Sequence, residues 1–468
     1  MKRTVATVVG ALLALSVLLG CQKKSGGGGG GGGTPGGHPG CHGWVGSNPR
    51  TPPPQGASQA EKLVFWTSHG PPDNGVLENI ANAYNATNPA VQVQFVQVPG
   101  SETDVTSLMT AVRGGTGPDV YMLDRFTVAQ RASDGLLEDL TEDLAKLDTN
   151  LKDKYLAFAW EEDQYRGKTY GLPFDTDTRG LFYNKQMLRD AGIDPAELDR
   201  KNGPITLERL REIARKVDTK DAQGNYTKIG FIPQLEQGWH YTWGFLFGGE
   251  FADLQAGKVT PAHPGVVAGF QYLYDYNKEM GVQQVQTFIS SYNPPNNPPQ
   301  QHPFITGHLA MMITGDWFIN TMRTYAADVD YDITFIPSVK KGDEPSTWAG
   351  GWTFVIPTGS KKKEAAVRFI HWACGAEGQR IYTKESGHCP TLLSISNDES
   401  IFTEKQTYFR EALFFTKSRP PLPVGALYWD ALSTAQDMVV QNVKTPQEAL
   451  QQAEQQTQPQ LNKFLPLQ

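Results

Sequence analysis

Apolar and polar residues follow strand-like and helix-like patterns in turn from residue 61 onward. The run "KLVFWT" predicts a buried strand that ends at Trp66, and "VQVQFVQV" predicts a strand with one solvated face. Residues 76–84, between these strands, carry apolar side chains at helical spacing, as do residues 105–112 after the second strand. The buried strand "PDVYML" follows, and this order predicts a parallel, doubly wound sheet flanked by helices.

A second series of elements begins after "LPFDTDTRGLFYN". Thr206 is expected to cap a helix over residues 207–217, and "LAMMIT" and "TFVIP" are expected to be strands. Further segments are expected to be helical (266–274, 361–374, 398–414, 428–441 and 446–458), and the prolines of 291–303 predict a loop. Because about 400 residues exceed what one hydrophobic core organises, we expect an α/β protein of two lobes.

The N-terminal segment has the features of an exported protein. Lys2 and Arg3 precede an apolar run that is short for a membrane span, so residues 1–20 are interpreted as a signal peptide. The ending "LLGC" resembles the bacterial lipobox, which implies that Cys21 is lipidated; the alternative is an ordinary signal peptide with an incidental cysteine. Residues 21–60 contain eight consecutive glycines and several prolines, so they are expected to form a tether between the lipid and the globular body.

Charge and motifs exclude several classes of function. Residues 1–20 hold two of the 42 basic residues and none of the 49 acidic ones, so the remainder carries a net charge of −9. An acidic body without a basic stripe argues against nucleic-acid binding. The sequence contains neither "HExxH" nor "GxSxG", and its nine histidines form no metal-ligand cluster, so neither a metal nor a cofactor is expected.

The four cysteines divide between the two ends of the chain. Cys21 is assigned to the lipid and Cys41 lies in the tether. Cys374 and Cys389 are expected to pair in an oxidising compartment, which would contribute roughly 3 kcal/mol through loop entropy. The alternative is that both are buried thiols.

Polar and aromatic residues gather at the predicted strand ends, where ligands bind in open parallel sheets. Trp348 and Trp352 flank the "AGG" before a predicted strand. The other residues of this kind are Trp66, Asp124, Arg125, Asp175, Asp177, Arg179, Trp239, Trp243, Asp316, Trp317, Tyr428 and Trp429. Carboxylates and guanidinium groups bind sugar hydroxyls, and flat rings pack against the apolar face of a pyranose. The set favours a carbohydrate cleft, although each member alone is also explained by capping, ion pairing or core packing.

Four motifs in order give the chain a family resemblance: "GTGPDVYMLDRF … DGLLEDL", "LPFDTDTRGLFYNKQML", "GHLAMMITGDWF" and "GGWTFVIPTGSKKKEAAVRFIHWACGAEGQ". Over residues 61–468 the chain resembles the bacterial extracellular solute-binding lipoproteins of ATP-driven (ABC) importers, in the sugar-binding group that includes the maltose-binding protein. The resemblance implies a two-lobed periplasmic-binding-protein fold (type II) with the ligand cleft between the lobes. It implies hinge crossings near 173–179, 309–314 and 350–355. The expected N-terminal lobe is then 61–174 plus 314–352, and the expected C-terminal lobe is 175–313 plus 353–468.

The resemblance also implies roles for particular residues. Asp124 and Arg125 match an Asp-Arg pair that binds sugar hydroxyls, and Trp317 matches a tryptophan that stacks on sugar. Asp177 matches an acidic residue that is a glutamate in the family, and Tyr428 with Trp429 match an aromatic pair in reversed order. Where the maltose binders carry an acidic-basic pair, this chain has Ser68 and His69, so the pocket is expected to differ from theirs.

Together these features predict a monomeric binding protein that closes on a sugar or oligosaccharide and delivers it to a membrane permease. One alternative is a glycoside hydrolase that uses the cleft aspartates as acid and base. Another keeps the fold and changes the ligand to glycerol-phosphate, a polyamine or an iron chelate. The tryptophans favour a sugar over these ligands.

Overall fold

The computed structural model describes residues 60–467. The predicted signal peptide, the predicted lipidation site Cys21 and the predicted tether up to residue 59 lie outside these residues. None of the helices in the described part combines the length and the apolar character that a membrane span requires.

The first sheet contains the strands predicted near the N-terminus. Its order is β2 (Val91–Gln97), β1 (Glu61–Thr67), β3 (Val120–Asp124), β16 (Trp352–Val355) and β6 (Gly171–Pro173). β1 runs parallel to β2 and β3, whereas β16 is antiparallel to β3 and β6. α1 (Asp73–Thr87) and α2 (Thr106–Arg113) connect the parallel strands, as the helical spacing predicted. β3 is buried along its length, whereas the first residues of the edge strand β2 alternate between buried and exposed, as their sequence does.

The second sheet follows the first along the chain. Its order is β14 (Tyr331–Thr334), β8 (Arg179–Asn184), β13 (Leu309–Gly315), β10 (Tyr226–Phe231) and β9 (Thr219–Lys220). β8 and β13 are buried along their whole lengths, so their continuous apolar runs lie in the centre of this sheet. α7 (Leu207–Val217) covers it, and the Thr206 hydroxyl accepts a hydrogen bond from the Arg209 N–H at 3.1 Å, which confirms the predicted cap.

The later predicted helices are present with small shifts of their ends. They are α9 (Pro264–Met280), α12 (Lys363–Ala373), α16 (Gly425–Val440) and α17 (Pro446–Leu461). The helix expected over 398–414 is shorter, because α15 spans only Glu404–Ala412 and is preceded by the single 3₁₀ turn Glu399–Ile401. Within the proline-rich stretch 291–303, one 3₁₀ turn, Pro299–Gln301, interrupts the expected loop.

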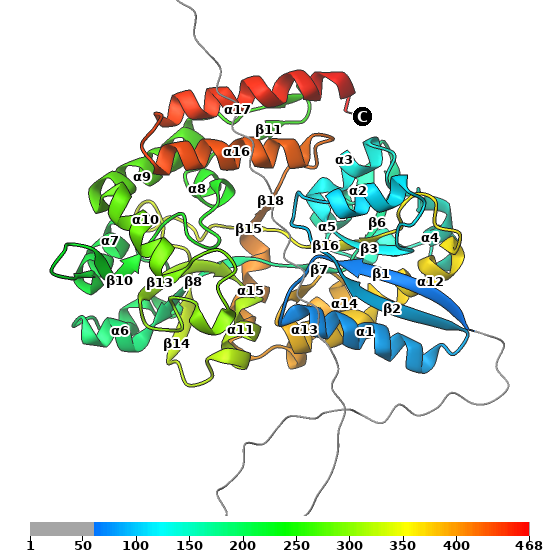
Figure 1. Ribbon diagram of the computed structural model, residues 1–468, viewed down its shortest axis with the longest axis horizontal. Coiled ribbons are helices and arrows are strands. Elements are labelled where there is room, and N and C mark those ends of the chain that lie inside the picture. The colour runs from blue at the N-terminus through cyan, green and yellow to red at the C-terminus, as the bar shows by residue number, and fades with distance from the viewer. Residues whose placement is uncertain (1–59, 468) are drawn as a thin grey trace, which may run out of the picture. The chain divides into compact units, whose positions relative to one another are not determined.

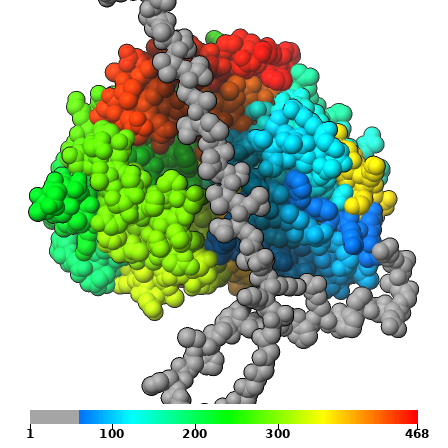
Figure 2. Space-filling view, in the orientation of Figure 1, coloured from blue at the N-terminus to red at the C-terminus, as the bar shows by residue number. Residues whose placement is uncertain are grey.

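Each sheet and the helices packed on it form a lobe. The first lobe comprises the first sheet with α1, α12 and α13 (Ala376–Ser386), whose apolar side chains share one core. The second lobe comprises the second sheet with α7, α9, α16 and α17, which share most of another core. Figure 1 shows the two groups side by side with β7 (Asp175–Thr176) and β15 (Thr347–Ala349) between them. In Figure 2 the N-terminal segments of the first lobe (blue and cyan) lie opposite the green segments of the second.

The strand pairing corrects the predicted lobe boundaries. β13 pairs with β8 and β10 inside the second sheet, so the crossing expected at 309–314 is absent, and β14 also stays in the second lobe. β16 pairs with β3 in the first sheet, so residues after 352 return to the first lobe rather than entering the second. The physical reason is that β13 and β16 are both buried apolar runs, and nothing in such a run specifies which sheet it joins.

The chain passes between the sheets along neighbouring segments. β7 pairs with β17 (Cys389–Pro390), and Asp177 forms a bridge with Gly350. The predicted crossings near 173–179 and 350–355 are therefore confirmed in place. The third passage lies between Ile401, in the core of the first lobe, and Tyr408, which packs in the second.

The predicted disulfide between Cys374 and Cys389 is wrong, because both are buried free thiols. Cys374 packs in the first-lobe core, where its Sγ donates to the Leu172 carbonyl at 3.2 Å. Cys389 packs against second-lobe side chains. The 11-residue helix α13 separates them, and a helix of that length is about 16 Å long, well beyond disulfide reach.

Candidate functional site

A cavity of about 360 Å³ lies where the strands of the two sheets end. Its lining comes from the residues after β1, from the ends of β3 and β13, from the start of β8 and from α16. Nine predicted site residues line it: Ser68, His69, Asp124, Asp177, Arg179, Trp239, Trp317, Trp352 and Trp429. Segments far apart in sequence thus meet at one opening, as expected for the carboxyl ends of strands in open α/β sheets.

Asp124 and Arg419 form an ion pair across the cavity. The Arg419 guanidinium donates to both carboxylate oxygens of Asp124, at 2.6 and 3.2 Å. Asp124 ends β3 in the first lobe, whereas Arg419 follows β18 (Thr416–Ser418), which pairs with β15. Burial raises the pKa of Asp124 to about 7, against the opposing attraction of Arg419. The pair therefore joins the two walls of the cavity through a bidentate contact.

A second pair, Asp177 and Arg179, lies on the crossing segment. The Arg179 guanidinium donates to Asp177 Oδ1, which also accepts from the Gly350 N–H at 2.7 Å. Burial favours a higher pKa for Asp177, but Arg179 and the nearby cations outweigh it and lower the pKa below its usual value. Asp177 is therefore an ionised acceptor at the pocket surface.

Aromatic faces support both guanidinium groups and leave other faces open. The Arg179 guanidinium carbon lies 3.4 Å from the ring centroid of Trp348, and that of Arg419 lies 4.0 Å from the centroid of Phe126. Trp239, Trp317 and Trp352 are partly exposed at the cavity, whereas Trp348 is 1% exposed. The site thus combines fixed charges with flat apolar surfaces that a ligand could cover.

Comparison with known proteins identifies the family. The family described as "Bacterial extracellular solute-binding protein" matches residues 79–409. The chain belongs to this family. Its members act outside the cytoplasm, so this solute-binding protein is an exported one.

Individual relatives are distant but similar along most of their lengths. The maltotriose-binding protein of Pyrococcus abyssi is 24% identical over 388 residues, or 82% of this chain and 78% of that protein. A maltooligosaccharide ABC transporter solute-binding lipoprotein of Streptococcus pneumoniae is 25% identical over 347 residues, or 72% of this chain and 74% of its own. The solved structure of CpMnBP1 with mannobiose bound has a TM-score of 0.75 at 24% identity, covering 85% of this chain and 100% of its own. These likenesses confirm the predicted type II two-lobed fold.

Six predicted site residues of this solute-binding protein do not line the cavity: Trp66, Arg125, Asp175, Trp243, Asp316 and Tyr428. Arg125 is the most instructive. It follows Asp124 directly, but its side chain turns away from the cavity and is fully buried. Its Nε donates to Glu162 at 2.9 Å and its other nitrogens donate to the carbonyls of Asp175 and Gly350.

Arg125 therefore braces the hinge and does not line the cavity. Its two carbonyl partners belong to different crossing segments, so one guanidinium holds both. Gly351 lies against it with a φ of 128°, a conformation that favours glycine, and a Cβ there would collide with the guanidinium. The "AGG" sequence thus leaves the space that Arg125 fills.

Asp175 and Asp316 lie beneath the cavity, buried at 1% and 0% exposure. Asp175 Oδ1 accepts from the Trp352 N–H at 2.6 Å, which fixes the start of β16. Asp316 Oδ2 accepts from the Cys389 N–H at 2.9 Å, which ties the end of β13 to β17. Both carboxylates hold backbone segments together and lie outside the cavity lining, so their predicted place in the cavity wall is corrected, while direct contact with a ligand stays a prediction.

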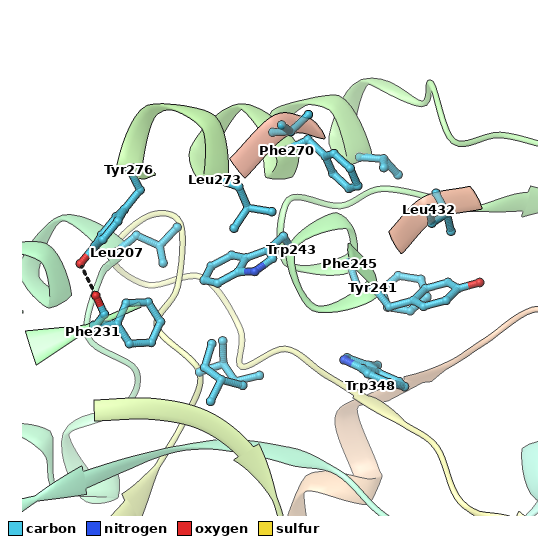
Figure 3. Close-up of a cluster of buried hydrophobic side chains, with 14 of the residues drawn as sticks. Leu207, Phe231, Tyr241, Trp243, Phe245, Phe270, Leu273, Tyr276, Trp348 and Leu432 are labelled. Carbon is cyan, nitrogen blue, oxygen red and sulfur yellow. Dashed lines mark hydrogen bonds between the residues drawn. The ribbon is translucent and has the colours of Figure 1, made fainter. Parts of the chain in front are cut away.

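The other three misplaced residues are aromatic and belong to cores. Trp66 packs against apolar side chains of α2, on the face of β1 opposite to the one that enters the first-lobe core. Trp243 is fully buried and donates its Nε1–H to the Gly238 carbonyl at 3.0 Å, and Figure 3 shows it among Phe231, Leu273 and Tyr276. Tyr428 donates its hydroxyl to the Phe251 carbonyl at 2.8 Å. Adjacent helix residues point about 100° apart, which is why Trp429 reaches the cavity and Tyr428 does not.

Ser68 and His69, which stand where the family carries charges, both line the cavity as predicted. The His69 ring meets the Trp352 ring edge-on, with centroids 4.3 Å apart. Burial lowers the pKa of His69 to about 4, so the imidazole is neutral at physiological pH. This part of the wall is therefore polar without being charged.

Nine residues that line the cavity were not anticipated from the sequence: Asp73, Gly100, Ser101, Glu102, Gln237, Gly350, Gly351, His388 and Arg419. Most of them lie in loops or helix starts. Gly350 and Gly351 belong to the "WAGG" stretch, of which only Trp348 was counted among the strand-end residues that favour a cleft. His388 lies in "GHCPT" and Arg419 in "KSRPPLP", where neither spacing nor period indicated a position at the cavity.

Proposed function

We propose that this solute-binding protein binds an oligosaccharide in the cavity between its lobes and delivers it to an ABC permease. One observation carries the proposal: partly exposed tryptophans and arginine-paired aspartates surround the same cavity. The names of two relatives and the ligand in one similar structure, maltotriose, maltooligosaccharide and mannobiose, point to the same ligand class.

The wall chemistry suits hydroxyl-rich ligands. Asp177 is an ionised acceptor, Gln237 both donates and accepts, and the guanidinium groups donate. Indole faces cover the apolar face of a sugar ring without needing a charge on it. Because Arg179 and Arg419 are each paired with an aspartate, neither offers an uncompensated positive charge, which argues against a phosphorylated ligand.

Closure follows from where the contacts lie. Ligand that touches Ser68 and Trp352 in the first lobe and Trp317 in the second stabilises only the arrangement in which both walls are close. Contacts such as Asn320 Nδ2 to Asp73 Oδ1, at 2.9 Å, also join the lobes in this arrangement. A micromolar affinity would need about −8 kcal/mol, which several hydrogen bonds and stacked rings supply.

The lipid anchor and the tether complete the proposal. Lipidation of Cys21 would hold the protein at the membrane, and the glycine-rich tether would let the lobes reach a permease. The lipoprotein named among the relatives supports this arrangement.

A thermal-shift screen tests the proposed ligand class. The full chain is expected to gain several degrees of melting temperature with one or a few members of a panel that includes maltotriose, mannobiose and their monosaccharides. Each mixture is also checked for cleavage products, and none are expected, because Asp124 and Asp177 are both paired with arginines. Stabilisation by glycerol-phosphate, a polyamine or an iron chelate alone would replace the sugar proposal, and hydrolysis would revive the glycosidase alternative.

The tryptophan after β13 is expected to contribute strongly to binding. Trp317→Ala should weaken binding of the stabilising sugar by at least about tenfold, as removal of a stacked aromatic residue typically does. Because Trp317 is partly exposed, the melting temperature without sugar should change little. Trp372→Ala is a matched control, since Trp372 is a partly buried tryptophan of the first lobe that does not line the cavity. Calorimetry that gives both variants the same affinity would remove Trp317 from the site.

A further inference from the structure

A buried histidine lies at the floor of the cavity, where the lobes meet. His388 follows α13 in the first lobe and precedes β17, and its side chain is 4% exposed. Its ring stacks on Tyr382 of α13, with centroids 5.1 Å apart, and on Trp317 of the second lobe, with centroids 5.9 Å apart. The imidazole therefore lies between side chains of both lobes.

Three carboxylates surround this imidazole. Its Nε2 lies 3.8 Å from Asp73 Oδ2, and its Nδ1 lies 3.7 Å from Asp175 Oδ2 and 3.6 Å from Asp316 Oδ1. Asp73 begins α1 in the first lobe, Asp175 belongs to the crossing strand β7, and Asp316 follows β13 in the second lobe. Among the described residues neither ring nitrogen is within hydrogen-bond distance of a partner, so the ring faces these carboxylates at ion-pair distance.

A protonated His388 supplies the positive charge that compensates the three carboxylates around it. The titratable groups that face His388 come from every element around it: Asp73 of α1, His69 of the loop before α1, Asp175 and Asp177 of the crossing, Asp316 after β13, and Tyr382 of α13. Burial alone would lower the pKa of His388, but Asp316, Asp73 and Asp175 outweigh it and raise the pKa to about 10. A neutral ring would leave the buried carboxylates without this cation.

We propose that His388 is a positioning residue that clasps the two lobes at the base of the cavity, because its imidazolium attracts carboxylates from both lobes and from the crossing. The clasp fixes Trp317 relative to the first-lobe wall. The consequence for ligand affinity rests on the proposed function, since a sugar needs both walls in place. The consequence for the ligand-free protein does not.

The sign of the pH dependence follows from the raised pKa. The histidine pKa is about 6.5 in the unfolded chain and about 10 in the folded one, so the stabilisation is complete below pH 6.5 and is lost as the pH rises to about 10. Burial also raises the pKa of Asp175 to about 6 and of Asp316 to about 7, so these carboxyls lower stability as the pH rises from about 4 to 7. Between pH 7 and 10, His388 is the one group among His388, Asp175 and Asp316 whose titration changes the stability of the folded protein.

Melting temperatures of the ligand-free full chain between pH 7 and 10 test the clasp. Wild type is expected to lose stability steadily over this range, whereas His388→Gln should start lower at pH 7 and show a flatter profile. His302→Gln is the matched control, because His302 is also buried beside a carboxylate, 3.1 Å from Glu236, but lies outside the cavity. Equal slopes for wild type and His388→Gln would overturn the proposal.

Affinity gives the second test, with maltotriose and mannobiose as probes at pH 7. His388→Gln should bind the active sugar at least about tenfold more weakly, as expected when one member of a buried ionic cluster is removed. His388→Lys should recover most of the loss, because it restores the positive charge. Equally weak sugar binding by both variants would overturn the clasp.

If His388→Gln does not fold, Asp73→Asn provides the test, because it removes one of the three carboxylates that attract the imidazolium. The variant should show a partly flattened dependence of melting temperature on pH, and an unchanged dependence counts against the clasp. If neither sugar binds wild type, the proposed ligand class fails while the pH comparison still decides the role of His388.

Discussion

Arg125→Ala is expected to lower the free energy of unfolding by about 3–5 kcal/mol, the usual cost of removing one partner from a buried ion pair. The change would leave the Glu162 carboxylate buried without its cation, and Glu162 is 2% exposed. It would also free the carbonyls of Asp175 and Gly350, which Arg125 joins at the hinge. Arg125→Lys should recover only part of the lost stability, because a lysine ammonium group cannot reproduce the planar arrangement of N–H donors in the guanidinium group.

Urea denaturation monitored by circular dichroism measures this effect. Arg189→Ala is the control, since Arg189 pairs with Asp330 on the surface at 2.7 Å, with both side chains about half exposed. An exposed pair of this kind contributes about 1 kcal/mol or less. If the Arg125 and Arg189 variants lose similar stability, the hinge role of Arg125 is contradicted.

Arg419→Ala is expected to weaken ligand binding by about 30-fold or more, in line with the loss of one partner from a buried, hydrogen-bonded charge pair. Arg419 is the cation that reaches across the cavity to Asp124, and its guanidinium also packs over the faces of Phe126 and Trp429. Without it Asp124 is buried and unpaired, so the carboxyl would take up a proton, because burial already raises its pKa to about 7. The pocket would then lose an acceptor as well as a donor.

A double-mutant cycle of Arg419→Ala with Asp124→Asn separates the contribution of the Asp124–Arg419 contact to ligand affinity from the contributions of the two side chains alone. The two single variants should each bind weakly, and the double variant should bind little worse than either, because both remove the same contact. Arg368→Ala is the control, since Arg368 pairs with Glu364 on the exposed face of α12. Calorimetry that finds the effects of Arg419→Ala and Asp124→Asn simply additive would contradict a shared role at the cavity.

The fold was predictable where burial imposes a regular period. The strict alternation of residues 91–98 and the helical spacing of 207–217 each bury one face, so their elements were predicted correctly. Sheet membership was harder, because β13 is buried along its whole length and β16 is buried after Trp352, so neither shows an alternating period. The prediction of a disulfide was wrong because it rested on sequence separation alone. A separation of 15 residues does not reveal that the helix α13 holds the two cysteines apart.

The site was predictable in part, because strand ends of parallel sheets converge. Asp124, Asp177 and Trp317 were placed at the cavity from that rule together with the family resemblance, and all three line it. The rule does not say which way a side chain turns after a strand ends, so Arg125 was placed in the cavity although it braces the hinge. His388 and Arg419 reach the cavity through tertiary packing, which leaves no local pattern in "GHCPT" or "KSRPPLP".

Small-angle X-ray scattering with and without the stabilising sugar tests the central claim, that this pocket closes on its ligand, most directly. The radius of gyration should fall when saturating sugar is added to wild type, and it should fall less for Arg419→Ala at the same sugar concentration. A radius that stays constant while calorimetry records one sugar bound per chain would contradict closure of the two lobes on the ligand.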